Sequence, residues 1–309
     1  MAYEGATAVL NNTETALDRQ ELALTVYAET MEAFERANIG LDLVYMQTIT
    51  SGKSAQFIIA GKADGTDVAQ HTAGTQVTVT DATFSERTIV VGLPEYTAKR
   101  IDNFEETMAH YEVRSHITRW MGQSLSIKMD KAIFTKIDAA AQATGVAGNG
   151  DGTTVTNTAI ASATTVEAKG DAIMESIYAA SAAIRANDYN DELYCVVRPA
   201  EYNALVLSKK LVNNDYTSGG NGGVDTGRIG MVGNIKVYES NNLPAWVATT
   251  NQLEALVFGR EAVGLVSLIG LTTNQKEQIE FLDATLMTAK YAYGIDVLNP
   301  AVAARIMSA

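Results

Sequence analysis

The sequence predicts an α+β protein, and three features support this prediction. Helical patterns run from about residue 17 to 37 and from residue 103 to about 143. Between them, residues 48–91 are rich in β-branched residues and alternate in polarity, as strands do. From residue 171 helices and strands alternate, and strands return at the end of the chain. Helices and strands are therefore segregated in one part of the chain and alternate in another.

Composition and charge exclude several functions. With 47% hydrophobic and 19% charged residues, the 309-residue chain has an ordinary globular balance. Its net charge of -13 argues against sequence-independent nucleic-acid binding, which depends on Lys and Arg. The longest apolar run, residues 262–271, is about half of the roughly 20 residues that a bilayer crossing requires. We expect no membrane span and no secretory signal, and the single cysteine fits a cytoplasmic origin.

The N-terminal part is expected to be an arm followed by a long projecting hairpin. After a loosely ordered start, the first helix should end near Asn38 and Gly40. Strands are then expected at 48–60, 75–80 and 88–91, around a polar tip that contains glycine. Two arms of about 15 residues, at about 3.3 Å per residue, would project about 50 Å. A compact chain of this length has a radius of gyration of only about 19 Å. Such a hairpin needs a second subunit to rest on.

The hairpin begins with Gly52-Lys53-Ser54, which resembles the end of a phosphate-binding loop. Gln47 stands where that loop requires an earlier glycine, and the short apolar segment 56–61 predicts a strand instead of a helix. A nucleotide-dependent enzyme is therefore the least favoured alternative.

The pattern from 103 to about 143 predicts one very long helix, with Gly122 as its weak point. Residues 145–165 are rich in Gly, Thr and Ala, and we expect a loop or flexible hairpin. A separate α/β domain should follow, and the strands of the tail should complete the domain that the long helix begins. The expected helices are 171–186 and 200–208, the mobile loop is 218–223, and the expected strands are 193–197, 233–238, 253–258, 263–270, 278–291 and 302–307.

No catalytic arrangement is apparent. His110 and His116 are six positions apart, on nearly opposite faces of the expected helix, and His71 is remote from them in sequence. Cys195 lies in an apolar strand, where a buried and inert thiol is expected. The glycine-rich loop lacks the strand-to-helix context of a dinucleotide site. We expect no catalytic, cofactor or metal site.

Three blocks of the chain closely resemble the major capsid proteins of T7-like short-tailed phages: ITSGKSAQFIIAG at 49–61, MAHYEVRSHITRWMGQSL at 108–125 and AKYAYGIDVLNPA at 289–301. Weaker similarity follows in the same order at 194–202, 233–244 and 260–266. The resemblance implies the Hong Kong 97 capsid fold. Its parts would be an N-terminal arm at 1–45, an extended loop at 46–92, a peripheral domain at 93–166 and 254–309 with a spine helix at 103–143, and an axial domain at 167–253.

The resemblance also implies function. The chain would form hexamers and pentamers of an icosahedral head that encloses double-stranded DNA without specific binding. Its partners would be itself, a scaffolding protein during assembly and a portal protein, and the shell would assemble in the host bacterial cytoplasm. The loop at Gly219–Gly223 would lie near the capsomer centre. The alternative is an encapsulin-like compartment of the same fold, which holds cargo protein.

The implied intersubunit contacts centre on the extended loop. Phe57, Ile58, Ile59, Val77 and Val79 should become buried only against an adjacent subunit. Two alternatives stay open, Phe57 as ordinary core and Arg114 in an internal ion pair. The candidate contact residues are Lys53, Gln56, Phe57, Ile59, Lys62, Val77, Val79 and Arg114.

Overall fold

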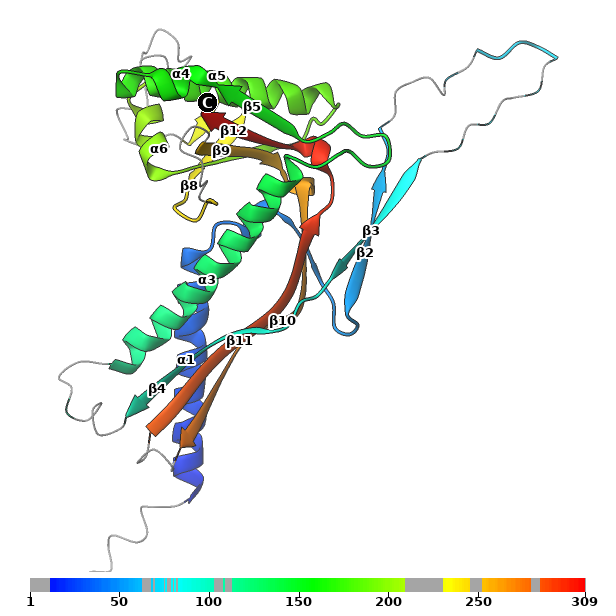
Figure 1. The fold of residues 1–309 in the computed structure, drawn as a ribbon. Coiled ribbons are helices and arrows are strands. Elements are labelled where there is room, and N and C mark those ends of the chain that lie inside the picture. The colour runs from blue at the N-terminus through cyan, green and yellow to red at the C-terminus, as the bar shows by residue number, and fades with distance from the viewer. Residues whose placement is uncertain are drawn as a thin grey trace, which may run out of the picture. The chain divides into compact units, whose positions relative to one another are not determined.

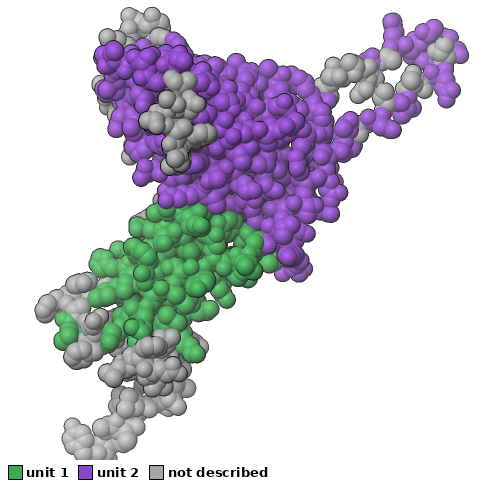
Figure 2. All heavy atoms as spheres, viewed as in Figure 1, with its two compact units in different colours: residues 1–38, 92–129, 267–293 green, residues 39–91, 130–266, 294–309 purple. Residues whose placement is uncertain are grey.

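A computed structural model describes residues 12–62, 68, 70–74, 76, 79, 81, 83–102, 108, 113–208, 230–244, 252–278 and 284–308. The chain forms two compact units (Figure 2). Unit 1 comprises residues 1–38, 92–129 and 267–293, and unit 2 comprises 39–91, 130–266 and 294–309. Within the described residues, no helix is long and apolar enough to cross a membrane.

Unit 1 contains α1 (Asn12–Ala37), β4 (Glu95–Asp102), the first part of α3 (Val113–Ala140) and most of two long strands, β10 (Val263–Gln278) and β11 (Ala284–Val297). β11 pairs antiparallel with β4, and β10 lies on the other side of β11 (Figure 1). The helices α1 and α3 approach closely at Gly122, where a Cβ atom would lie 2.5 Å from the carbonyl oxygen of Thr30. The expected weak point is thus a packing contact, and α3 continues through it.

Unit 2 is built on a six-stranded mixed sheet in the order β5-β12-β9-β6-β8-β7. Helices α4 (Thr158–Ser162), α5 (Val166–Ala186) and α6 (Pro199–Val206) lie beside this sheet (Figure 1). Their apolar residues share one core with the strands. β6 runs parallel to β8 and antiparallel to β9. The strands are β5 (Thr153–Asn157), β6 (Leu193–Val197), β7 (Met231–Val232), β8 (Ile235–Glu239), β9 (Gln252–Gly259) and β12 (Ala303–Ser308).

The hairpin of unit 2 is a separate two-stranded sheet. β2 (Ser54–Ala60) pairs antiparallel with β3 (Phe84–Val90) over seven residues each. The paired strands are therefore about half as long as the arms of about 15 residues that the sequence suggested. β1 (Tyr45–Thr48) belongs to a different sheet, beside β10. The short 3-10 helices are η1 (Leu41–Leu43), η2 (Arg260–Ala262) and η4 (Pro300–Val302).

Most predicted elements are confirmed, including α1, α5, α6, β6 and β9. The prediction of a loop throughout 145–165 is wrong, because this stretch contains β5 and α4. β5 is stabilised by parallel pairing with β12, about 150 positions later, and Asn157 caps α4 by accepting the N–H of Ala159 at 2.9 Å. A local pattern cannot reveal such a distant partner. The tail strand predicted at 263–270 extends to Gln278.

Some predictions stay open. Residues 103–107 and 109–112 of the expected spine helix lie outside the described residues, as do most of the expected strand 75–80 and the whole loop 218–223.

β9 and β12 lie in the same sheet as β6, although β6 was expected in the axial domain and most of β9 and all of β12 in the peripheral domain. The domain boundaries remain a prediction.

Candidate functional site

The turn before β2 leads into a strand, whereas a phosphate-binding loop leads into a helix. Gly52 adopts a positive φ of 99°, which favours glycine, and Ser54 begins a strand, as predicted. The strand then pairs with β3, and the carbonyl of Lys53 accepts the N–H of Val91 at 2.8 Å. No helix N-terminus is available at this turn to face an anion.

One face of the β2–β3 pair is buried within the chain. Ala55, Phe57 and Ile89 lie on this face and are 7%, 8% and 1% exposed. Phe57 packs edge-on against Tyr45, with the ring centroids 5.9 Å apart. This face attaches the hairpin to unit 2.

The opposite face is exposed and carries large apolar side chains among polar ones, Ser54, Gln56, Glu86 and Thr88. Ile58, Phe84 and Val90 point away from the buried face and are 77%, 64% and 55% exposed. Among the described residues, no further strand pairs with β2 or β3, so the outer edge of each strand is open. An exposed apolar face with open edges is typical of a surface that another chain covers.

Polar contacts fix the end of β2, where the chain leaves the paired strands. Nζ of Lys62 lies 2.6 Å from a carboxylate oxygen of Asp188. The side chain of Asn149 donates to the carbonyl of Ala60 at 3.2 Å. A Cβ atom on Gly61 would lie only 2.3 Å from the carbonyl oxygen of Ala147, so glycine is required there. These contacts hold the start of the loop while its apolar face stays uncovered.

The candidate contact residues do not share one environment. Phe57 is already buried within the chain, because the alternation of side chains along β2 turns it towards Tyr45. The prediction that Phe57 becomes buried only against an adjacent subunit is therefore wrong. Lys53, Gln56 and Val79 are exposed, whereas Ile59 and Arg114 are half-buried. Lys62 is engaged with Asp188, and Val77 lies outside the described residues. Ile58 was among the residues predicted to contact a neighbour, whereas Phe84 and Val90 were not. Their exposure follows from the pairing of β3 with β2. The last strand of the hairpin was expected only at 88–91, whereas β3 begins at Phe84.

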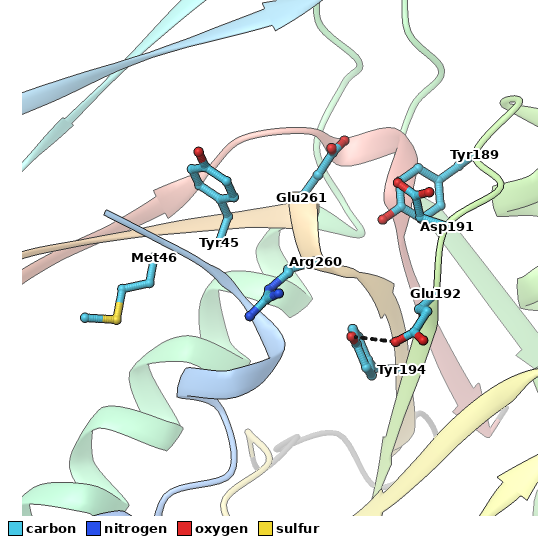
Figure 3. A pocket seen from close by; sticks show the side chains of 8 residues that line it. All are labelled: Tyr45, Met46, Tyr189, Asp191, Glu192, Tyr194, Arg260 and Glu261. Atoms are coloured by element: carbon cyan, nitrogen blue, oxygen red, sulfur yellow. Dashed lines mark hydrogen bonds between the residues drawn. The ribbon is translucent and has the colours of Figure 1, made fainter. Parts of the chain in front are cut away.

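A second candidate is an open cavity of about 620 Å³ in unit 2. Figure 3 shows Tyr45 and Met46 of β1 on one side and the segment before β6 on the other. It is lined by Tyr45, Met46, Tyr189, Asp191, Glu192, Tyr194, Arg260 and Glu261.

Most polar groups of this cavity already have partners. Glu192 accepts hydrogen bonds from Tyr194 at 3.2 Å and from Lys236 at 2.7 Å, and these bonds lower the pKa of its carboxyl. Arg260 donates to the carbonyl oxygens of Asp42 and Val44. Burial, together with the nearby carboxylates, raises the pKa of Tyr189 to about 12. Most of these polar groups therefore bind one another, Lys236 or the backbone.

The remaining candidates for chemistry are the single cysteine and the three histidines. Cys195 is fully buried, as predicted, and burial raises the pKa of its thiol to about 12. His71 and His116 are exposed, and His110 lies outside the described residues. Across the described part of the chain, no three His, Cys, Asp or Glu side chains are grouped so that they could hold a metal ion.

Solved structures with a similar fold are shells of viruses and virus-like particles. The capsid protein of cyanophage P-SCSP1u is 29% identical, with a TM-score of 0.73 over 88% of both chains. The mature capsid of bacteriophage PhiM1 shares the fold at 18% identity, with a TM-score of 0.69 over 87% of this chain and 86% of that one. The fold and the exposed hairpin thus define a phage capsid protein of the Hong Kong 97 type.

The sequence comparisons identify the family. The model of the family described as "Gp10A-like: Major capsid protein" matches residues 57–307. The chain is 26% identical to the major capsid protein of Escherichia phage T7 over 94% of this chain and 92% of that protein. The chain therefore belongs to the Gp10A-like family of major capsid proteins, as the three sequence blocks implied.

Proposed function

We propose that this chain is the shell-forming subunit of a phage head, in which copies associate as hexamers and pentamers of an icosahedral capsid around double-stranded DNA. Family membership and the fold support the proposal. The observation that contributes most is the exposed face of the hairpin, where Ile58, Phe84 and Val90 are uncovered although the opposite face is packed.

The energetics favour assembly into a closed shell over a simple pair. Burying one large aliphatic or aromatic side chain contributes about 1.5–3 kcal/mol, so three contribute roughly 5–9 kcal/mol. Association costs an estimated 4–15 kcal/mol in lost translational and rotational freedom alone. One hairpin contact is therefore weak, and stable association requires several contacts per subunit, as in a ring.

The intersubunit contact would centre on Ile58, Phe84 and Val90. Lys53 and Gln56, at the exposed start of the loop, would add polar contacts, and Val77 and Val79 would extend the apolar surface. Ile59, on the same face of β2 as Phe57, would contribute a contact from that face. Phe57 would support this surface from the inside. Lys62 would hold the loop through Asp188, and Arg114 would contribute a contact from α3.

The other partners follow from the role in the head. A scaffolding protein and a portal protein would associate with the subunit during assembly in the host cytoplasm. The net charge of -13 suits a shell that encloses DNA without binding it tightly. The subunit would be divided into the expected N-terminal arm, extended loop, peripheral domain and axial domain.

An encapsulin-like compartment is the alternative. A virus-like particle from Pyrococcus furiosus shares the fold, with a TM-score of 0.57 at 11% identity. Identity at that level supports a common fold alone. The match to the family of phage major capsid proteins favours the phage head.

Electron microscopy of the expressed chain tests the proposal. We expect shells or capsomers, alone or with the scaffolding protein from the same genome. A chain that stays monomeric with its scaffolding protein would contradict the proposal. A nucleotide-binding role is tested separately by equilibrium binding of ATP, where we expect no saturable binding that Lys53→Ala removes.

A further inference from the structure

Three charged side chains from three elements meet inside unit 2. Nζ of Lys169, on α5, lies 3.2 Å from Oε1 of Glu201 on α6 and 3.5 Å from Oε2 of Glu254 on β9. Glu254 and Glu201 are only 3% and 6% exposed, whereas the side chain of Lys169 is 31% exposed. Both carboxyl groups are thus inside the protein, and their shared cation reaches towards its surface.

The charges do not balance if both carboxyl groups are ionised. Two carboxylates beside one ammonium group leave a buried net charge of about -1, and burying an uncompensated charge costs several kcal/mol. In addition, Oε2 of Glu201 and Oε2 of Glu254 are buried without a hydrogen-bond partner. One proton resolves both problems, because it neutralises the cluster and provides a donor.

We propose that Glu254 is protonated at neutral pH and donates a hydrogen bond to Glu201, so that this pair and Lys169 form a neutral clasp between α5, α6 and β9. Burial, and then the hydrogen-bonding Glu201, raise the pKa of Glu254. The Ser308 hydroxyl on β12 and the charge of Lys169 oppose this shift without reversing it. No residue of the hairpin takes part in this clasp.

The clasp makes the packing of α6 sensitive to pH. When Glu254 loses its proton, the buried cluster becomes negative, while the helices around it remain closely packed. At the adjacent Gly170, a Cβ atom would lie only 2.0 Å from the carbonyl oxygen of Ala204. We therefore expect repulsion between Glu201 and Glu254 to loosen the packing of α6 and β9 against α5 at higher pH.

The sign of the stability effect follows from linkage. Between the ordinary glutamate pKa of 4.5 and the higher value of Glu254 in the fold, the folded chain binds more protons than the unfolded chain. Stability from this pair is therefore fully present at low pH, falls as pH rises through that window and is constant above it.

The test compares urea unfolding of the unassembled wild-type chain and Glu254→Gln from pH 5 to 9. The glutamine keeps the shape and a hydrogen-bond donor but cannot ionise. We compare the equilibrium constant of unfolding of the wild type with that of the variant at each pH. The ratio of the two constants should rise with pH, by about tenfold in total for each unit by which the fold raises the pKa of Glu254. Glu192→Gln, at an exposed carboxyl paired with Lys236, is the control and should not show this rise. Parallel pH curves for the wild type and Glu254→Gln would overturn the proposal.

A spectroscopic measurement covers the case in which the variant fails to fold. The infrared spectrum of the folded wild type at pH 7 should contain the C=O band of one protonated carboxyl group, and this band should disappear as pH rises while the fold persists. If Glu254→Gln folds, the band should be absent from it at pH 7. Absence of the band from the wild type at pH 7 would overturn the proposal, whatever the variant does.

Discussion

The carboxylate of Asp130 on α3 accepts the backbone N–H of Gly40 at 3.0 Å, across 90 positions of the chain. The same carboxylate accepts the N–H of Ile39 at 3.3 Å and the side-chain amide of Asn242, also at 3.3 Å. Asp130 is fully buried, and burial raises its pKa although these hydrogen bonds oppose the rise. One side chain thus joins three segments of unit 2.

Asp130→Ala should lower the free energy of unfolding by about 3 kcal/mol, because it leaves buried backbone and side-chain donors without an acceptor. Urea unfolding followed by circular dichroism measures this loss. Asp296→Ala is the control, since its carboxylate forms an exposed ion pair with Lys136 and should cost less than about 1 kcal/mol. Equal losses in the two variants would show that the buried hydrogen bonds are unimportant.

Gly122→Ala should destabilise the chain although alanine is the better helix former by about 1 kcal/mol. The new Cβ would lie 2.5 Å from the carbonyl oxygen of Thr30 and 3.0 Å from Cβ of Ala33, so α1 must shift. We expect a net loss of about 1–3 kcal/mol, measured by thermal or urea unfolding. Gln123→Ala, at the exposed neighbouring position of α3, should be neutral or slightly stabilising. A gain in stability for Gly122→Ala would contradict the close packing of these helices.

Phe57 and Ile58 should separate folding from assembly. Phe57→Ala should lower subunit stability by about 3 kcal/mol, because Phe57 is buried against Tyr45. Ile58→Asp should change subunit stability by less than about 0.5 kcal/mol, since Ile58 is 77% exposed, yet prevent shell formation. Unfolding experiments report the first effect, and sedimentation with electron microscopy reports the second.

Val166→Asp is the matched control for this prediction, since Val166 is an exposed apolar residue outside the hairpin, at the start of α5. It should leave both folding and assembly intact. Normal shells from Ile58→Asp would place the intersubunit contact elsewhere.

Shortening the loop tests the same contact more broadly. Replacement of residues 62–74 by a short Asn-Gly turn should leave the subunit folded and remove the lateral contact. The loss of the Lys62 ion pair with Asp188 should cost at most about 1 kcal/mol, because both groups are partly exposed. Circular dichroism reports the fold and sedimentation reports assembly. A misfolded subunit would indicate that the excursion belongs to the core.

Cys195 should be unreactive in the folded chain. With a pKa of about 12, only about one thiol in ten thousand is ionised at pH 8, and the side chain is fully buried. A thiol-reactive dye should label the chain rapidly in denaturant and, without denaturant, only at the rate at which the structure opens. Because Cys195 is the single cysteine, the signal has no other source. Rapid labelling of the native subunit would contradict its burial.

The sequence by itself determined those elements whose pattern is local. The run Leu193–Val197 is apolar throughout and forms the central strand β6, and Pro199 begins α6, as its fixed φ favours. The strand after Gly52-Lys53-Ser54 was also predictable, because neither an upstream glycine nor a helical pattern accompanies that motif. The three sequence blocks were sufficient to indicate the family.

Tertiary structure decided everything that depends on distant partners. Thr153–Asn157 is a strand because β12 pairs with it, and its local composition resembles a loop. Phe57 and Ile58 are adjacent apolar residues, but the register of β2 buries one and exposes the other. Glu201 and Glu254 are ordinary acidic residues in sequence, and only the packing of α5 against α6 and β9 brings them to one lysine. Sequence patterns specify local conformation and polarity, whereas the choice of face, partner and protonation state depends on contacts between segments far apart in the chain.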